Sequence, residues 1–369
     1  MLRSDEFPLP PGEGQGEGGI RCLTGYSHNG ILGPDILITH RERSTSDRIA
    51  SRRKVDNVRA GVEAREDPDF LIIARTNAIR QVSFEESMVQ VLSTQHSALF
   101  LGRIVMLPAE YDITGKVVLI TGAGRGIGKG IAQVLAEAGA DIALNALTPK
   151  YVESTAAEIA KVSGRRVLPV MADGTNTHGV QGAIDTVMKE FGRIDVLINN
   201  LGDSIRKPLV ALPGKANAAT ALSDDELKFV MDVNLTEAIL CTRAVGPHLL
   251  ERRSGKVINI SSWTARQGGG EMVVYTIAKT ALVGFTRAQA LEWAPYGVHV
   301  NAIAPGIFPD PVTSGEDRAR QTAQRAAQLV PLGRPGQLRE VGLLALYLAS
   351  PASNYMTGQT IFLDGGMSL

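Results

Sequence analysis

The stretch that decides the fold reads Val117-Val-Leu-Ile-Thr-Gly-Ala-Gly-Arg-Gly-Ile-Gly128. Four apolar residues lead directly into a glycine-rich turn, and apolar residues with helical spacing follow over residues 127–138. Glycines let the backbone turn tightly and approach a pyrophosphate, and the first turn of a helix offers unpaired N–H groups to an anion. The stretch therefore predicts a strand, a phosphate-binding loop and a helix, the first unit of a dinucleotide-binding fold.

Short apolar runs recur after this loop and alternate with segments of helical spacing, such as residues 152–162 and 282–294. This alternation is typical of a parallel sheet covered by helices on both faces. We therefore predict an α/β protein, a doubly wound Rossmann fold with a seven-stranded parallel sheet, within residues 106–369. The seven runs are residues 117–120, 141–144, 167–171, 194–198, 256–260, 299–303 and 360–363.

Residues 1–105 differ in composition and are expected to form a poorly structured N-terminal extension. Residues 1–20 are rich in Gly, Pro and Glu, a composition typical of disorder. Basic residues gather within residues 40–66, but acidic residues interleave with them, which favours a solvated helix face over a nucleic-acid-binding arm. We expect this region to be a fusion remnant or the product of an overextended reading frame, contributing little to catalysis.

The overall composition points to a small-molecule partner. Lys plus Arg equals Asp plus Glu at 38 each, so no net field attracts nucleic acid or an anionic membrane. Cys22 and Cys241 are far apart in the sequence and lack metal-site spacing, so we expect neither a disulfide framework nor a bound metal. No apolar run reaches the roughly 18 residues needed to span a bilayer, and residues 1–20 lack a signal-peptide core. A cytoplasmic protein is expected.

Tyr275 and Lys279 are spaced by one helical turn, in a YxxxK pattern. Their side chains are therefore expected on the same face of a helix. A tyrosine is a poor base near its ordinary pKa of about 10, and a cation one turn away favours the phenolate. The pair predicts an acid/base tyrosine, although the pattern alone is also common by chance.

Two polar residues accompany this pair. Ser262 follows an apolar run, so it is expected at the carboxyl end of a strand, where ligands bind in doubly wound folds. It either hydrogen-bonds a substrate oxygen or caps the next segment. Asn234 is either part of the site or a turn residue.

Together these motifs resemble the short-chain dehydrogenase/reductase family over about residues 110–369. The resemblance rests on the TGxxxGxG spacing of residues 121–128, Asn199-Asn200-Leu201-Gly202, Asn234, Ser262, Tyr275 with Lys279, and Asn301-Ala-Ile-Ala-Pro305-Gly306.

The resemblance implies an NAD(P)-dependent oxidoreductase that interconverts a ketone and a secondary alcohol, either 3-oxoacyl reductase-like or sugar/polyol dehydrogenase-like. It implies that Tyr275 exchanges the proton with the substrate oxygen and that Ser262 orients this oxygen. Lys279 is expected to lower the pKa of Tyr275 and to contact the nicotinamide ribose, and Asn234 to hold a proton-relaying water. A homotetramer or homodimer is also implied.

The same resemblance implies a set of cofactor contacts. Asp173 corresponds to a residue that contacts adenine, and Ile307 to one that binds the nicotinamide carboxamide. Leu201 departs from the alanine usual in the family's NNAG motif and is expected to shift the adenosine ribose slightly. The full set is Gly122, Arg125, Gly126, Ile127, Gly128, Asp173, Asn200, Gly202, Tyr275, Lys279, Pro305, Gly306 and Ile307.

The choice between NADP and NAD depends on the residues after the second strand. An acidic residue there normally binds the ribose hydroxyls of NAD, but the sequence reads Leu144-Asn-Ala-Leu147. Arg125 is available to a 2′-phosphate, so the sequence favours NADP over NAD.

Substrate specificity is expected in the variable segments 203–223 and 308–332. Arg206 and Lys207 either meet a substrate carboxylate or phosphate or are solvated surface residues. Relatives that act on acyl carrier protein have two basic docking positions. Arg253 corresponds to one of them, but the other is Tyr296 here, which weakens the case for a carrier-bound substrate.

Two alternative functions remain at this stage. Residues 55–78 resemble one helix-strand unit of the isocitrate lyase/phosphoenolpyruvate mutase superfamily, with Arg75 in the position of a substrate-binding arginine. However, about 105 residues cannot build the roughly 200-residue barrel of that superfamily. A catalytically silent cofactor-sensing protein would require a broken catalytic set, and Asn234, Ser262, Tyr275 and Lys279 are all present.

Overall fold

The computed structural model describes residues 108–213 and 221–369 in full. Of the first 107 residues, it describes the backbone of two short strands, β1 (Ile38–His40) and β2 (Phe70–Ile72), which pair antiparallel. The chain divides into two units, Met1–Leu107 and Pro108–Leu369. The expectations for residues 1–20 and 40–66, and Cys22, otherwise lie outside the described residues.

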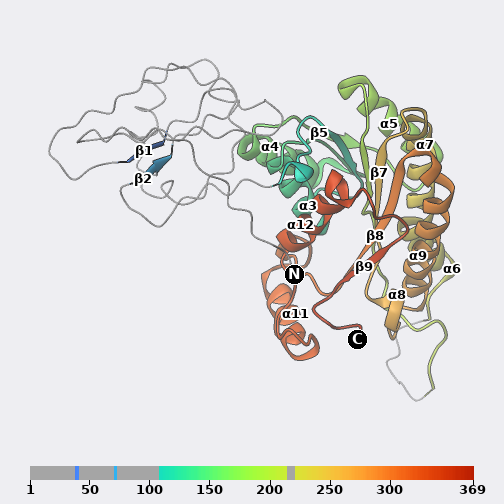
Figure 1. Cartoon of the computed structure of the whole chain (residues 1–369). Coiled ribbons are helices and arrows are strands. Elements are labelled where there is room, and N and C mark those ends of the chain that lie inside the picture. The colour runs from blue at the N-terminus through green and yellow to red at the C-terminus, as the bar shows by residue number, and fades with distance from the viewer. Residues whose placement is uncertain (1–37, 41–69, 73–107, 214–220) are drawn as a thin grey trace, which may run out of the picture. The chain divides into compact units, whose positions relative to one another are not determined.

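The second unit is built on the predicted seven-stranded parallel sheet, in the order β5-β4-β3-β6-β7-β8-β9 (Figure 1). Every neighbouring pair of strands in this sheet is parallel. The order runs outward in both directions from the β3/β6 pair, which is the switch point where doubly wound folds bind ligands. The strands are β3 (Val117–Ile120), β4 (Asp141–Ala146), β5 (Val167–Met171), β6 (Val196–Asn199), β7 (Gly255–Ile260), β8 (Val298–Pro305) and β9 (Thr360–Leu363).

Helices cover both faces of this sheet (Figure 1). One core contains α3 (Gly126–Glu137), α4 (Pro149–Ser163) and α12 (Leu338–Ala349). The other contains α5 (Thr177–Phe191), α7 (Glu237–Glu251) and the end of α9 (Val273–Trp293). Val118 and Ile120 of β3 belong to the first core, whereas Val117 and Leu119 belong to the second. This alternation explains why the strand reads as a continuous apolar run.

The remaining elements are short or lie after the strand ends. They are η2 (Ala109–Tyr111), α6 (Asp224–Met231), the π-helical segment η3 (Asp232–Thr236), α8 (Thr264–Gln267), η4 (Ala294–Tyr296), α10 (Pro311–Ser314), α11 (Glu316–Leu329) and η5 (Pro351–Ser353). Within the described residues, no helix is long and apolar enough to cross a membrane. In the same part of the chain, no cluster of three or more His, Cys, Asp or Glu side chains is arranged to hold a metal.

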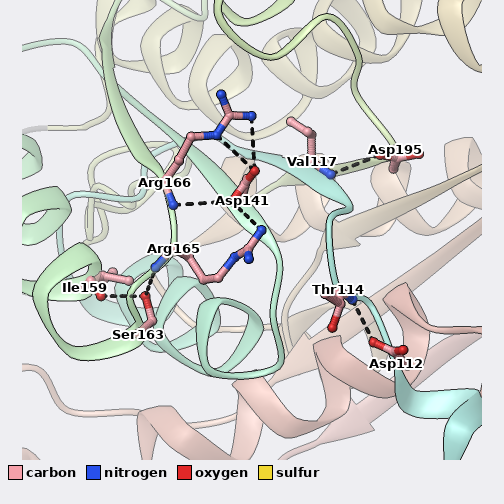
Figure 2. Close-up of polar contacts among 9 residues, drawn as sticks. All are labelled: Asp112, Thr114, Val117, Asp141, Ile159, Ser163, Arg165, Arg166 and Asp195. Carbon is pink, nitrogen blue, oxygen red and sulfur yellow. Dashed lines mark hydrogen bonds and ion pairs between the residues drawn. The ribbon is translucent and has the colours of Figure 1, made fainter. Parts of the chain in front are cut away.

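Buried carboxylates hold the amino end of the sheet. Figure 2 shows Asp141, at the start of β4, bound by both Arg165 and Arg166, with N–O distances of 2.7 and 3.1 Å. Asp195, just before β6, accepts a hydrogen bond from the backbone N–H of Val117 at 3.0 Å (Figure 2). Three further cations lie within 4 Å of Asp195, namely Lys116, Arg193 and Arg252. The buried carboxylates at this end of the sheet are therefore paired with cations. The candidate site lies at the opposite, carboxyl end of the strands.

Candidate active site

The glycines of the loop between β3 and α3 are required either by the backbone conformation or by close neighbours. Gly122 and Gly126 have φ values of 61° and 58°, which favour glycine. A Cβ atom at Gly128 would lie 2.6 Å from Nδ2 of Asn200. That amide in turn donates to the carbonyl oxygens of Thr121 and Gly122 at 2.8 and 3.0 Å. The loop thus leaves backbone N–H groups at the start of α3 open to an anion, with Ile127 half-buried in the first turn.

Two cations flank one aromatic ring beside this loop. The guanidinium of Arg125 lies 4.9 Å from the ring centroid of Tyr151, and the ammonium of Lys150 lies 5.1 Å from it. Lys150 and Tyr151 belong to the first turn of α4, directly after β4. Neither residue belongs to a motif of the sequence, although the Thr-Pro start of α4 is a helix-start signal that places them after the second strand.

The carboxylate of Asp173 is engaged within its own loop. It accepts hydrogen bonds from the N–H and hydroxyl of Thr175 at 2.8 and 2.7 Å, and from Nδ2 of Asn176 at 2.8 Å. These bonds hold the pKa of Asp173 below its ordinary value. Its expected contact with adenine stays a prediction. The neighbouring Gly174 lies against Glu237 and Leu201, since a Cβ there would be 3.1 Å from Cγ of Glu237 and 3.5 Å from Cδ2 of Leu201.

Tyr275 lies in the first turn of α9 and is hydrogen-bonded to the hydroxyl of Ser262 at the end of β7. Burial and the charge of Asp203 raise the pKa of Tyr275, while the hydrogen bond from Ser262 and the charge of Arg206 oppose this rise. Nζ of Lys279 lies 5.8 Å from the centroid of the Tyr275 ring. The expected effect of Lys279 on the pKa of Tyr275 stays a prediction.

Lys279 is fixed to the end of β7 by two reciprocal hydrogen bonds. Its Nζ donates to the carbonyl oxygen of Ile260 at 2.8 Å, and the hydroxyl of Ser261 donates to the carbonyl oxygen of Lys279 at 2.8 Å. Burial lowers the pKa of Lys279 to about 8, opposed by the charge of Glu237. Lys279 therefore presents a buried, weakly held proton next to the site.

Asn234 is placed by the π-helical segment η3, a type of irregularity common at functional sites. Its Nδ2 donates to the carbonyl oxygens of Asp203 and Val230 at 2.7 and 2.8 Å, whereas its buried Oδ1 has no partner among the described residues. A Cβ at Gly202 would lie 2.7 Å from this Oδ1 and 3.1 Å from Nζ of Lys279. An unpaired acceptor and an ammonium therefore face the same small space, as a ribose or an ordered water requires.

The chain after β8 closes the far side of the site. Pro305 is the last residue of β8, and a Cβ at Gly306 would lie 2.7 Å from Cα of Asp364. The carbonyl oxygen of Ile307 accepts a hydrogen bond from the N–H of Gly336 at 2.9 Å. Asp310 follows at the N-cap of α10, and its Oδ2 lies 3.5 Å from the position of a Cβ on Gly126. A carboxylate thus stands beside the phosphate-binding loop.

Arg206 and Lys207 differ in their surroundings. Nζ of Lys207 is 2.5 Å from Oε1 of Glu226, so its charge is neutralised. Arg206 is exposed, and within residues 108–213 and 221–369 it has no ion-pair partner. Its charge acts on Tyr275. Of these two cations, Arg206 is therefore the one available to a substrate at the reacting centre.

Comparison with known proteins agrees with this geometry. A family model described as enoyl-(acyl carrier protein) reductase matches residues 122–368. The chain is 38% identical over 257 residues to a 3-oxoacyl-[acyl-carrier-protein] reductase of Synechocystis sp., covering 69% of this chain and 98% of that protein. It is 34% identical over 267 residues to a 2-dehydro-3-deoxy-D-gluconate 5-dehydrogenase of Escherichia coli, covering 71% and 98%.

A solved structure shows the same likeness. The crystal structure of a gluconate 5-dehydrogenase from Burkholderia cenocepacia, in complex with NADP and tartrate, matches with a TM-score of 0.63 and 32% identity. The match covers 70% of this chain and 97% of that one. These comparisons give no support to a lyase-like role for residues 55–78 or to a catalytically silent protein.

Proposed function

Because the chain belongs to the short-chain dehydrogenase/reductase family, and is thus an NAD(P)-dependent oxidoreductase, we propose that it interconverts an alcohol and a ketone on a carboxylate-bearing substrate. The observation that carries this proposal is the set of groups around the Tyr275 hydroxyl. Ser262 hydrogen-bonds it, and the charge of Arg206, which has no ion-pair partner among the described residues, acts on it. The exposed guanidinium of Arg206 is therefore a candidate partner for a carboxylate on a substrate whose reacting oxygen is placed between Tyr275 and Ser262.

The chemistry assigned to the side chains follows from their protonation. The raised pKa keeps Tyr275 protonated at neutral pH, so it is a proton donor to the oxygen of a ketone undergoing reduction. Ser262 donates a hydrogen bond to the same oxygen and stabilises the negative charge that develops there. The bound nicotinamide cofactor supplies or accepts the hydride. Lys279 and Asn234 face the space from which a proton can be returned to Tyr275.

The residues of the cofactor site fit a dinucleotide. The glycine loop at the start of α3 suits a pyrophosphate, and the unpaired Oδ1 of Asn234 faces Lys279 across Gly202. We assign Gly122, Gly126, Ile127, Gly128, Asn200 and the segment Pro305, Gly306 and Ile307 to this site, with Asp173 at its adenine end.

Arg125 and Lys150 support a preference for NADP. Both cations lie beside Tyr151 after β4, where an NAD-specific site would carry a carboxylate. Two cations at one position suit a 2′-phosphate. We expect NADPH to bind at least tenfold more tightly than NADH, measured by fluorescence titration. Lys150→Ala should weaken NADPH binding and leave NADH binding unchanged, and tighter binding of NADH to the native protein would contradict the assignment.

A substrate with a carboxylate agrees with the gluconate named for two similar proteins and with the tartrate, a dicarboxylate, bound in one. A carrier-protein substrate has less support. Arg253 donates to the carbonyl oxygen of Pro295 at 2.6 Å, and its guanidinium lies 5.5 Å from the ring centroid of Tyr296. Its charge is thus already engaged with neighbouring groups.

Activity is tested with gluconate and 2-dehydro-3-deoxy-D-gluconate, each beside its methyl ester, by following NADPH absorbance. Arg206→Ala should lower kcat/KM on the acids at least tenfold more than on the esters, because a charge-assisted hydrogen bond contributes roughly 1.5–3 kcal/mol. Lys207→Ala is the matched control and should change neither. Equal losses on acids and esters in Arg206→Ala would rule out carboxylate recognition, and full activity in Tyr275→Phe would rule out the mechanism.

A sheet edge that has no partner strand among the described residues supports a homo-oligomer, and we propose a tetramer. β9 ends the sheet, and a pocket of about 820 Å³ lies between its residues Thr360 and Phe362 and α9. Leu291 of α9 lines this pocket and is 81% exposed. Exposed strand edges and apolar helix faces are commonly covered by another chain. Light scattering of the native protein and of Leu291→Asp tests this, since a monomeric native protein would contradict it.

We also propose that catalysis resides in residues 106–369 and that the enzyme is cytoplasmic. The described site residues all lie after residue 120, and the free thiol of Cys241 is compatible with a reducing compartment. Expression of residues 106–369 should give kcat within twofold of the full chain, and loss of activity would contradict this. Subcellular fractionation tests the location.

A further inference from the structure

Ser262 is contacted from one side by two groups of a single residue, Thr264. The backbone N–H of Thr264 donates to Oγ of Ser262 at 3.2 Å, and its hydroxyl donates to the same oxygen at 3.0 Å. Both side chains are buried, with 1% of Thr264 and 4% of Ser262 exposed. Because a hydroxyl oxygen has two acceptor positions, both positions of Ser262 are occupied by Thr264.

This arrangement leaves the hydrogen of Ser262 as its remaining hydrogen-bonding group. With no substrate bound, the phenol oxygen of Tyr275, which interacts with the Ser262 side chain, is the partner available to that hydrogen. A hydroxyl that accepts hydrogen bonds is polarised and becomes a stronger donor. Without Thr264, the Ser262 hydroxyl could rotate and donate elsewhere.

The local backbone explains why Thr264 is held in this orientation. Thr264 begins the short helix α8, in which Ala265 N–H donates to the carbonyl oxygen of Ser262 at 3.0 Å and Gly268 N–H to that of Thr264 at 2.8 Å. The methyl group of Thr264 lies 3.3 Å from the position of a Cβ on Gly269. A threonine is also stiff at χ1, so its hydroxyl keeps this direction at little entropic cost.

We propose that Thr264 is a positioning residue for the reaction, whose hydroxyl fixes the Ser262 hydroxyl so that its single hydrogen is directed to the phenol oxygen of Tyr275 when no substrate is bound and to the reacting substrate oxygen when one is. This inference rests on the proposed roles of Ser262 and Tyr275. Thr264 itself touches neither the substrate oxygen nor the phenol in this assignment, and it acts through Ser262.

Two substitutions separate the hydroxyl of Thr264 from its shape. Thr264→Val keeps the shape and the backbone N–H but removes the hydroxyl donor, whereas Thr264→Ser keeps the donor. With gluconate and NADP as substrates of the full chain, Thr264→Val should lower kcat about tenfold with KM within twofold, the loss expected for one hydrogen bond. Thr264→Ser should stay within twofold of the native enzyme in both constants.

A second measurement needs no substrate. The ultraviolet absorbance of the phenolate is titrated with pH in each protein and in the same protein carrying Tyr275→Phe, so the difference reports Tyr275 alone. Thr264→Val should move the midpoint upward relative to Thr264→Ser, because Ser262 then donates more weakly to the phenolate. A merely structural role of Thr264 would leave this midpoint unchanged.

The outcomes distinguish this inference from the function on which it rests. If Ser262→Ala and Tyr275→Phe lose activity while Thr264→Val equals the native enzyme in kcat and midpoint, the inference fails alone. If Thr264→Ser is impaired as much as Thr264→Val, the hydroxyl is not the active group and the inference also fails. If Ser262→Ala and Tyr275→Phe keep full activity, the proposed function fails with it.

Discussion

Glu237 carries a carboxyl group buried at the start of α7, where 1% of its surface is exposed. The hydroxyl of Thr121 and the thiol of Cys241 hydrogen-bond to it, the latter with Sγ and Oε1 3.5 Å apart. Lys279 interacts with its charge, and Gly174 packs against its side chain. Burial outweighs these favourable contacts and raises the pKa of Glu237 from 4.5 to about 7.

The direction of this shift makes the contribution of Glu237 to the stability of the protein fall as pH rises. Between the unfolded and folded pKa values of Glu237, the folded state binds more protons than the unfolded state. One pKa unit corresponds to about 1.4 kcal/mol, so the rise from 4.5 to about 7 costs about 3 kcal/mol at pH 8 relative to pH 4. Glu237→Gln keeps a similar shape without the titration. We therefore compare the unfolding free energy of the variant with that of the native protein at each pH. The difference, variant minus native, should be about 3 kcal/mol larger at pH 8 than at pH 4.

Urea unfolding followed by tryptophan fluorescence, at pH values from 4 to 8, measures this difference. Glu226→Gln is the control of opposite sign, because the hydrogen bond and charge of Lys207 lower the pKa of Glu226. Its contribution to stability is present above its unfolded pKa and is lost as the pH falls, so this variant should lose stability at high pH. A constant gap between Glu237→Gln and the native protein across the range would refute the reasoning.

Three further predictions concern other parts of the structure. Asp195→Ala should lower the unfolding free energy by roughly 3 kcal/mol, because it leaves the Val117 N–H and three cations without their carboxylate. Asp185 is exposed, so Asp185→Ala is the control and should change the unfolding free energy by less than about 0.5 kcal/mol in the same urea assay. Asp310→Asn should tighten NADPH binding several-fold by removing a negative charge beside the phosphate loop, and weaker binding in a fluorescence titration would contradict this. Gly128→Ala should weaken NADPH binding at least tenfold, since its Cβ would meet Asn200 at 2.6 Å, and unchanged affinity would show that the loop adapts.

The sheet could be predicted from the sequence because its strands are buried on both faces. Val117 to Ile120 alternate between two cores, which requires four apolar residues in a row and leaves a clear signal. The start of α9 is less clear from the sequence. The helix begins at Val273, whereas its apolar residues have helical spacing only from residue 282. The first turns of α9 face the site, so polar residues such as Tyr275 and Lys279 interrupt the apolar pattern there.

Some site residues left no local signal. Lys150 joins Arg125 only through the ring of Tyr151, a contact between segments about 25 residues apart. Glu237 and Thr264 belong to none of the sequence motifs, and their importance comes from burial beside Thr121 and Ser262. The helical spacing of Lys279 and Tyr275 was correct, but spacing alone did not reveal that Lys279 Nζ is directed to Ile260.

The two ends of the sheet respond to different kinds of protein engineering. Asp141 and Asp195 organise their cations at the amino ends of β4 and β6, at the opposite end of the strands from Ser262. Substitutions that add or exchange ion pairs at the amino end of the sheet should change thermal stability and leave substrate specificity unaffected. Libraries aimed at new substrates should instead vary the segment around Arg206, where changes leave these ion pairs intact.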